Sequence, residues 1–215
     1  MNWFDQIDAY CERTDFSYWS EPVNAITNAA FLIVAILMFG RTKGHPWARV
    51  LTIILFAIGV GSYLFHTHAT AWASAADVAP IALFILTYLF LVNWHMLRWP
   101  WWAAFIAMLG FLPYAAGITL VLRDIVFFQV SNFYWTVPLL LILYTPFVPA
   151  KTARGFVIGA ALLSLSITVR SVDETVCAGW PLGTHFGWHI LNALMLGWMI
   201  DVYRTHMVEA PAIQG

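Results

Sequence analysis

Charged residues are scarce in this sequence of 215 residues. Only 10% are Asp, Glu, Lys or Arg, whereas a soluble domain usually carries about a quarter. The formal net charge is -1 and no basic patch is present, which argues against a nucleic-acid partner. Hydrophobic residues make up 61% of the chain, more than a soluble core of this length can bury. The composition therefore predicts a single polytopic membrane domain over residues 1–215.

A secretory signal is also lacking. Such a signal begins with basic residues and continues into an apolar run, whereas residues 1–22 are acidic and aromatic. This segment contains one basic residue, Arg13, and five acidic residues: Asp5, Asp8, Glu12, Asp15 and Glu21. We therefore expect residues 1–22 to stay in the mature protein as an acidic segment outside the membrane. Internal repeats are absent as well, which weakens a transporter interpretation based on duplicated halves.

Long apolar runs dominate the rest of the chain. A helix needs about 20 residues to cross the hydrocarbon core of a bilayer. Seven runs approach that length: residues 23–40, 47–66, 77–96, 101–121, 126–148, 154–171 and 184–203. Pro113 and Pro138 interrupt the fourth and fifth runs. Because the connections are short, consecutive helices are expected to be antiparallel neighbours in an all-α bundle of seven transmembrane helices.

The basic residues predict the orientation of this bundle. Seven fall in connections on one side: Arg41, Lys43, Arg49, Arg98, Lys151, Arg154 and Arg204. Arg13, Arg123 and Arg170 fall on the other side. The excess makes the first side cytoplasmic, with the N-terminus outside and the C-terminus inside. Short connections and the absence of a retrieval signal favour a bacterial cell membrane, and the sequence carries no signal for the oligomeric state.

Polar side chains gather at the outer ends of three of these runs. Ser62 and His66 are four residues apart, as are His185 and His189, and residues at this spacing share one face of a helix. Asp77 begins the third run. Antiparallel spans bring all five residues to one depth of the membrane. Ionisable groups within a membrane are costly and mark functional sites.

The three histidines predict a zinc site with His66, His185 and His189 as ligands. Catalytic zinc commonly has three protein ligands and leaves the fourth position to water. Three neutral imidazoles leave the charge of the ion at +2, which lowers the pKa of such a water to about 7. Asp77 is then suited to accept and return a proton, and Ser62 to donate a hydrogen bond to an oxyanion.

Other assignments of these residues remain open. Asp77 can be a direct zinc ligand, and His68 can replace one of the three histidines. Without a metal, the histidines can form ordinary hydrogen bonds between helices.

The ordered set Ser62-x-x-x-His66, Asp77 and His185-x-x-x-His189 resembles the motifs of the alkaline ceramidases. These belong to a superfamily of seven-helix membrane proteins that includes the adiponectin and progestin receptors. The start of the chain, Cys11-Glu12-Arg13 with Glu21-Pro22 and Asn24, is also similar, whereas the middle helices match only in hydrophobicity. The resemblance implies hydrolysis of the amide of a ceramide-like membrane lipid by zinc-activated water. It assigns the three histidines as ligands, Asp77 as acid and base, and Ser62 as oxyanion partner.

The resemblance also implies a calcium ion held by the acidic N-terminal segment. The matching oxygens are those of Asp8, Glu12, Asp15 and Glu21, and carboxylates are the ligands that hard cations prefer. The segment looks shorter between Cys11 and Glu21 than in eukaryotic members, and Asp8 matches only after a shift of one residue. The alternative is a plain acidic, solvated segment.

Cys11 and Cys177 are the only cysteines. Both are expected outside, where a disulfide persists, and the family pairs such cysteines. A bridge would pin the N-terminal segment beside the zinc ligands; the alternative is two independent small residues.

The function expected from the sequence is therefore a zinc-dependent hydrolase of lipid amides. The main alternative is a receptor-like or structural membrane protein in which zinc only holds helices together, and a closed site with four protein ligands would favour it.

Overall fold

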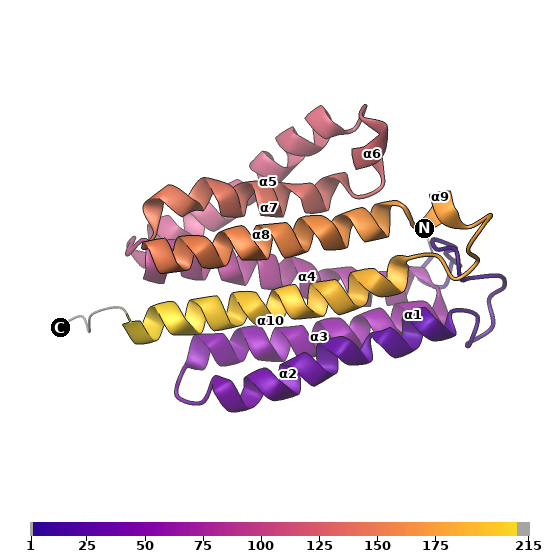
Figure 1. Ribbon diagram of the computed structural model, residues 1–215, viewed down its shortest axis with the longest axis horizontal. Helices are drawn as coiled ribbons and strands as arrows, with labels where there is room; N and C mark the ends of the chain where they lie inside the picture. Colours follow the sequence, from indigo (N-terminus) through magenta and orange to yellow (C-terminus); the bar gives the residue numbers. More distant parts are fainter. Residues whose placement is uncertain (1, 210–215) are drawn as a thin grey trace.

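The computed structural model describes residues 2–209, so residue 1 and residues 210–215 of the predicted domain lie outside the described range. Within that range the chain is helical, and an isolated bridge between Gln6 and Thr70 is the one strand-like pairing (Figure 1). The elements are α1 (Pro22–Thr27), α2 (Ala29–Arg41), α3 (Pro46–His68), α4 (Ala71–Leu91), the π-helix η1 (Val92–Met96), α5 (Trp101–Leu122), α6 (Val126–Gln129), α7 (Asn132–Tyr144), the 3-10 helix η2 (Thr145–Phe147), α8 (Ala150–Ser171), α9 (Asp173–Val176) and α10 (His185–Glu209). The predicted all-α class is confirmed.

Among residues 2–209, five helical stretches are long and apolar enough to cross a membrane. They are Pro22–Arg41 (α1 with α2), Pro46–His68 (α3), Ala71–Met96 (α4 with η1), Trp101–Leu122 (α5) and Ala150–Ser171 (α8). α7 has only 13 residues, and α10 is long but carries polar residues such as Asn192 and Asp201 among its apolar ones. Large apolar side chains such as Ile36 and Val121 are more than 60% exposed, as lipid-facing residues are. These features indicate an integral membrane protein.

The run at residues 126–148 does not form the single continuous helix that its hydropathy predicts. The chain forms α6, breaks at Ser131, whose φ of -130° is not helical, and continues as α7 and η2. Pro113 and Pro138 lie inside α5 and α7, so neither proline ends its helix. In a membrane protein, neighbouring groups can satisfy the carbonyl that a proline leaves free.

The long helices close into a ring. α10 packs on α8, α8 on α7, α7 on α5, α5 on α4, α4 on α3, α3 on α2 and α2 on α10. Figure 1 shows most of their axes running along the long dimension of the molecule, whereas α5 slants away from the others toward α6. Fully buried apolar side chains such as Leu55, Phe156 and Ile200 fill the space between the helices.

Residues 2–21, here called the N-terminal cover, contain no helix and lie over one end of the ring. The Ile7 N–H donates to the Ala69 carbonyl (2.8 Å), and the Ala71 N–H donates to the Asp5 carbonyl (3.0 Å). These bonds hold the cover against the turn between α3 and α4, where Ala69 adopts a φ of +46°. In Figure 1 this end also holds α9 and the start of α10.

Candidate metal centre

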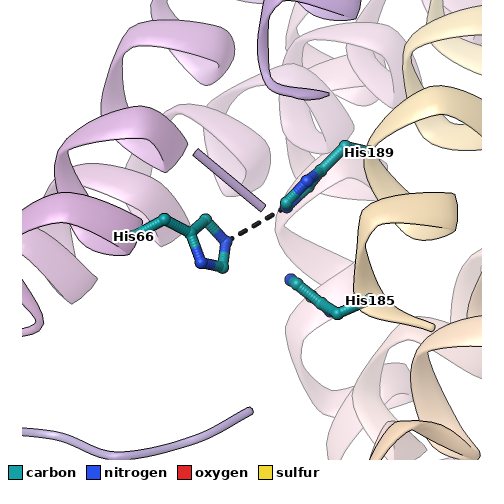
Figure 2. Close-up of side chains that lie close together, drawn as sticks. All are labelled: His66, His185 and His189. Carbon is teal, nitrogen blue, oxygen red and sulfur yellow. Dashed lines mark hydrogen bonds between the residues drawn. The ribbon is translucent and has the colours of Figure 1, made fainter. Parts of the chain in front are cut away.

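Three histidines from two helices meet beneath the N-terminal cover. His66 lies in the last turn of α3, and His185 and His189 lie in the first two turns of α10 (Figure 2). One ring nitrogen from each lies within 4.8 Å of the others. The three side chains are 0%, 2% and 0% exposed, in that order. The structure therefore brings together the three residues that the sequence predicts as zinc ligands.

The spacing of two ring nitrogens matches that of ligands to one ion. His66 Nε2 and His189 Nε2 are 3.1 Å apart. In a tetrahedral zinc site with Zn–N bonds of about 2.0–2.1 Å, two nitrogens lie about 3.3 Å apart. A proton shared by the two rings gives a similar distance, so the hydrogen-bond partners of the opposite ring nitrogens help to distinguish the two cases.

In neutral imidazoles, those partners leave both Nε2 atoms without a proton. His66 Nδ1 lies 2.6 Å from Glu21 Oε2, and an ionised carboxylate only accepts, so Nδ1 is the donor. The Thr27 hydroxyl donates to the Val23 carbonyl (2.8 Å), so it accepts from His189 Nδ1 (2.9 Å). Two Nε2 lone pairs then face each other, an arrangement that a cation between them stabilises.

His185 is positioned differently. Its Nδ1 is buried and has no hydrogen-bond partner among the described residues. Its ring stacks on Tyr10 of the N-terminal cover, with centroids 3.6 Å apart and planes at 18°. A buried ring nitrogen without a partner is costly.

The Glu21 carboxylate is part of a buried charged chain. Arg13 Nε donates to Glu21 Oε1 (2.5 Å), Arg13 Nη2 donates to the His66 carbonyl (2.9 Å), and Asn24 Nδ2 donates to Glu21 Oε2 (3.0 Å). Burial by itself raises the pKa of Glu21, but the hydrogen bond from His66 and the charge of the Arg13 guanidinium lower it by more. The net pKa is below its ordinary value, which keeps Glu21 ionised.

The four predicted calcium ligands are not brought together. Glu12 accepts the N–H groups of Val23 (2.7 Å) and Asn24 (2.8 Å) at the start of α1, and Glu21 pairs with Arg13. Asp8 and Asp15 are exposed. Hydrogen bonds from Ser17 hold the pKa of Asp15 below its usual value. Within residues 2–209 the three histidines are the only group of three or more such ligands in range of one ion, so the calcium expectation gains no support.

Asp77 and Ser62 lie beside His66. Ser62 is 4% exposed, and Asp77 on α4 lies close to both Ser62 and His66 on α3. Asp77 is not part of the group whose ligand atoms lie within 4.8 Å. His68 is exposed and packs against Tyr18 and Trp72, away from the other histidines.

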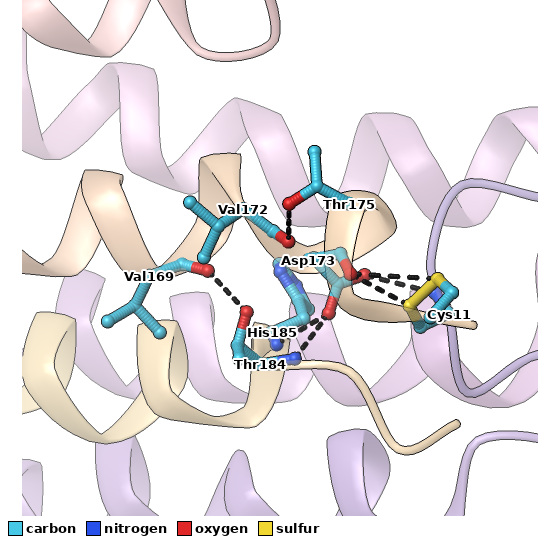
Figure 3. The surroundings of a disulfide bond; sticks show 8 residues. Cys11, Val169, Val172, Asp173, Thr175, Thr184 and His185 are labelled. Atoms are coloured by element: carbon cyan, nitrogen blue, oxygen red, sulfur yellow. Dashed lines mark hydrogen bonds between the residues drawn. A yellow bond between two sulfur atoms is a disulfide. The ribbon is translucent and has the colours of Figure 1, made fainter. Parts of the chain in front are cut away.

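Cys11 and Cys177 form a disulfide that links the N-terminal cover to the segment before α10, with Cα atoms 5.4 Å apart (Figure 3). Asp173 reinforces this link. Its Oδ2 accepts the Cys11 N–H (3.0 Å), and its Oδ1 accepts the N–H groups of Thr184 (2.6 Å) and His185 (2.8 Å). Asp173 thus fixes the first turn of α10, which carries two of the three histidines.

An apolar cavity of about 50 Å³ lies inside the ring of helices, and along α10 it extends from the histidines toward the C-terminal end of that helix. Its lining comes from α3, α4, α5, α7, α8 and α10 and includes Ile58, Ile81, Phe84, Tyr134, Trp188, Met195 and Met199. The cavity is smaller than a lipid chain, but methionine side chains are flexible and adjust to a ligand.

Sequence reasoning missed four residues around this centre. Thr27 and Tyr10 carry no signal, because their contacts depend on how distant elements pack. The sequence predicts Glu21 only as a calcium ligand. Its position directly before Pro22 is typical of the start of a helix, and Glu21 does lie at the N-terminal end of α1. The sequence predicts a role for Arg170 in orientation alone, although an arginine within an apolar run also marks a functional site.

No model of a known protein family matches the sequence, and no curated protein matches it.

Proposed function

We propose that this protein is a zinc-dependent membrane hydrolase that cleaves the amide bond of lipids, with ceramide-like lipids as the first substrates to test. The observation that carries the proposal is the convergence of three buried imidazoles, two of them held with their Nε2 lone pairs facing each other. Asp77 and Ser62 beside them, and an apolar cavity next to them, fit an acyl amide better than a soluble substrate.

The residues divide the chemistry as follows. His66, His185 and His189 would hold the zinc ion, which when bound polarises a carbonyl and makes water nucleophilic at neutral pH. Asp77 accepts the proton of the attacking water and delivers it to the leaving amine. Ser62 donates a hydrogen bond to the amide oxygen as negative charge develops there. The ring of helices excludes bulk water, which strengthens these polar interactions.

We also propose that the chain crosses the membrane seven times, with the N-terminal cover and the histidines outside and the end of α10 in the cytoplasm of a bacterial cell. Besides the five apolar stretches, α7 with η2 and α10 would supply the remaining two crossings. The excess of basic residues at the end opposite the histidines supports this orientation. The disulfide between Cys11 and Cys177 fits an oxidising exterior.

A receptor-like or structural protein is the second candidate. The observation that favours it is the near-complete burial of the three histidines, which are at most 2% exposed beneath the N-terminal cover. A zinc ion enclosed in this way would hold α3 and α10 together without access for a substrate.

Elemental analysis combined with a lipid-amide panel tests the proposal. We expect one zinc ion per chain and release of fatty acid by the wild type. His189→Ala should lose the zinc, whereas Asp77→Asn should keep it and lose turnover by about 100-fold or more. Asp124→Asn is the matched control, because that side chain is 82% exposed at the same end of the molecule.

The outcomes separate the two candidates. Purified protein without zinc would end the hydrolase proposal. Zinc-loaded wild type and Asp77→Asn that release fatty acid equally slowly would favour the receptor-like candidate.

A further inference from the structure

Arg170 lies in the last turn of α8, and its positively charged guanidinium is at the edge of the apolar cavity. Its guanidinium carbon lies 5.4 Å from the ring centroid of Tyr134 and 5.7 Å from that of Trp188, and both rings line the cavity. The ring of Tyr10, which stacks on His185, lies 5.8 Å from the same carbon. Three aromatic rings therefore surround the guanidinium at the end of the cavity that is nearest the start of α10.

The guanidinium has unused hydrogen-bond donors. Nη1 donates to the Ser131 hydroxyl (2.8 Å) and the Val130 carbonyl (3.3 Å), and Nη2 donates to the Tyr10 hydroxyl (3.3 Å). An arginine has five N–H groups, and no other hydrogen bond from Arg170 occurs within residues 2–209. Two of the five, including the Nε–H, are thus left without an acceptor in that range.

Arg170 also lacks a nearby carboxylate. None of the ion pairs among residues 2–209 includes it, and Asp77 acts on it only from a longer distance. Arg13, which is buried at the same end, is paired directly with Glu21. Arg170 is half-buried and has no acid of its own, so a ligand that carries negative charge could pair with its guanidinium.

The position of Arg170 along the bundle indicates which part of a lipid it would meet. The Thr184 hydroxyl donates to the carbonyl of Val169, so the end of α8 is level with the start of α10. The cavity extends the other way along α10, from Trp188 to Met199. A lipid with its chain in the cavity and its amide at the histidines would have its headgroup on the side of Arg170.

We propose that Arg170 and the Tyr10 hydroxyl bind a carboxylate on the amine side of the scissile amide, so that N-acyl amino acids are preferred over neutral lipid amides. This inference rests on the proposed hydrolase function. A planar guanidinium with two free donors suits a carboxylate, which can accept two parallel hydrogen bonds. Tyr10 accepts from Arg170, so its own O–H proton remains available to the same carboxylate.

Binding of two matched amides to the purified full-length chain tests this inference. N-lauroylglycine and N-lauroylethanolamine share the acyl chain and the amide and differ in a terminal carboxylate or hydroxyl. Titration is done after zinc chelation, so that neither is cleaved. We expect the wild type to bind N-lauroylglycine at least about tenfold more tightly, as charge-assisted hydrogen bonds provide.

Arg170→Met should abolish this preference, and Arg170→Lys should retain part of it, because it keeps the charge and loses the planar fork. Arg123→Met is the matched control: its side chain is 62% exposed and paired with Asp124, so the preference should persist. If Arg170→Met fails to fold, the test compares the preference of Arg170→Lys with that of the wild type, and a reduced preference in Arg170→Lys supports the inference. Equal affinity of the wild type for both amides, or a preference that survives in both Arg170 variants, would overturn the inference.

Two further arms separate related explanations. Laurate is compared with dodecanol. An effect of Arg170 on laurate but not on N-lauroylglycine would assign the site to the released fatty acid and reject the substrate preference. Hydrolysis of both amides is measured in parallel with zinc present. If both amides are hydrolysed but N-lauroylglycine is not bound more tightly, only this inference is rejected. If N-lauroylglycine is bound more tightly but neither amide is hydrolysed, the proposed function is rejected and Arg170 is still a binding site for an anion.

Discussion

At the scale of single residues, the chemistry of the three histidines is set by groups that do not touch the proposed ion. Glu21 and Thr27 accept from the Nδ1 atoms of His66 and His189, and this determines which ring nitrogens present lone pairs. Arg13 in turn holds Glu21. Such outer partners orient metal ligands and typically contribute 10- to 100-fold to metal affinity.

Glu21→Gln tests this role. The amide keeps the shape of Glu21 but loses the charge that pairs with Arg13 and His66, so we expect zinc affinity to fall by about 10- to 100-fold. Competition with a chromophoric chelator measures the change. Glu174→Gln, an exposed acid at the same end, is the control and should bind zinc as the wild type does.

Because Glu21→Gln leaves the Arg13 charge unpaired and can unfold the chain, Thr27→Val provides a milder test. It removes only the acceptor for His189 and should weaken zinc binding by about tenfold. If both variants fold and bind zinc as tightly as the wild type, Glu21 and Thr27 have no part in orienting the ligands.

At the scale of residues, the sequence predicts the three histidines better than it predicts the residues that contact or surround them. Two pairs of polar residues at a spacing of four predict shared helix faces, and the structure brings the histidines together. The partners come from three separate parts of the chain: Tyr10 and Glu21 from the N-terminal cover, Thr27 from α1 and Arg170 from α8. Their contacts depend on side-chain directions across the bundle, which neither spacing nor hydropathy encodes.

At the scale of the elements, the close approach of α3 and α4 brings Asp77 near Ser62 and His66. A Cβ on Gly61 would lie 2.0 Å from the backbone oxygen of Ala76. A backbone atom in a packed helix cannot move aside as the tip of a flexible side chain can, so the two helices must separate.

We therefore expect Gly61→Ala to destabilise the protein by about 3 kcal/mol or more and to lower its zinc content. Thermal unfolding in detergent and elemental analysis measure the two effects. Gly110→Ala in α5 is the control, because a Cβ there meets nothing within 4 Å. A Gly61→Ala protein as stable as the control would show that the helices are not constrained at this point.

Asp173 links three elements at once: the N-terminal cover, α9 and the first turn of α10. It is 2% exposed and accepts three backbone N–H groups. Asp173→Ala should lower the free energy of unfolding by about 1–3 kcal/mol, since those buried donors lose their acceptor. The unfolding midpoint measures this, with Asp124→Ala as the exposed control. Equal midpoints would mean that water replaces the carboxylate.

Hydropathy predicts most elements but not their continuity. The limits of α3, α5 and α8 lie within four residues of the expected runs, because each has a long, uniform apolar stretch. The run at residues 126–148 contains the polar residues Gln129, Ser131 and Asn132 but is apolar on average, so its mean hydropathy does not reveal the break at Ser131. The side chain of Ser131 accepts from Arg170 of α8, a contact between distant residues that holds the break in place.

At the scale of the whole molecule, the ring of helices gives the protein a polar centre at one end and an apolar interior behind it. On α10, Met199 lies ten residues beyond His189, and a helix rises about 1.5 Å per residue. The lining of the cavity therefore extends about 15 Å from the histidines. An acyl chain that enters this interior has its length limited by the side chains along the way, if the proposed hydrolase function is correct.

Met195→Trp tests this limit. Met195 is 4% exposed and lines the cavity midway between His189 and Met199. The larger, rigid indole should fill the cavity of about 50 Å³ and reduce hydrolysis of long-chain amides by at least about tenfold, while short-chain amides are still cleaved and the zinc content is unchanged. Leu194→Trp is the control, because Leu194 is 52% exposed on the outer face of the same helix. Since the indole adds bulk without touching the histidines, an equal loss for all chain lengths would mean that the chain binds elsewhere, between the helices and the surrounding lipid.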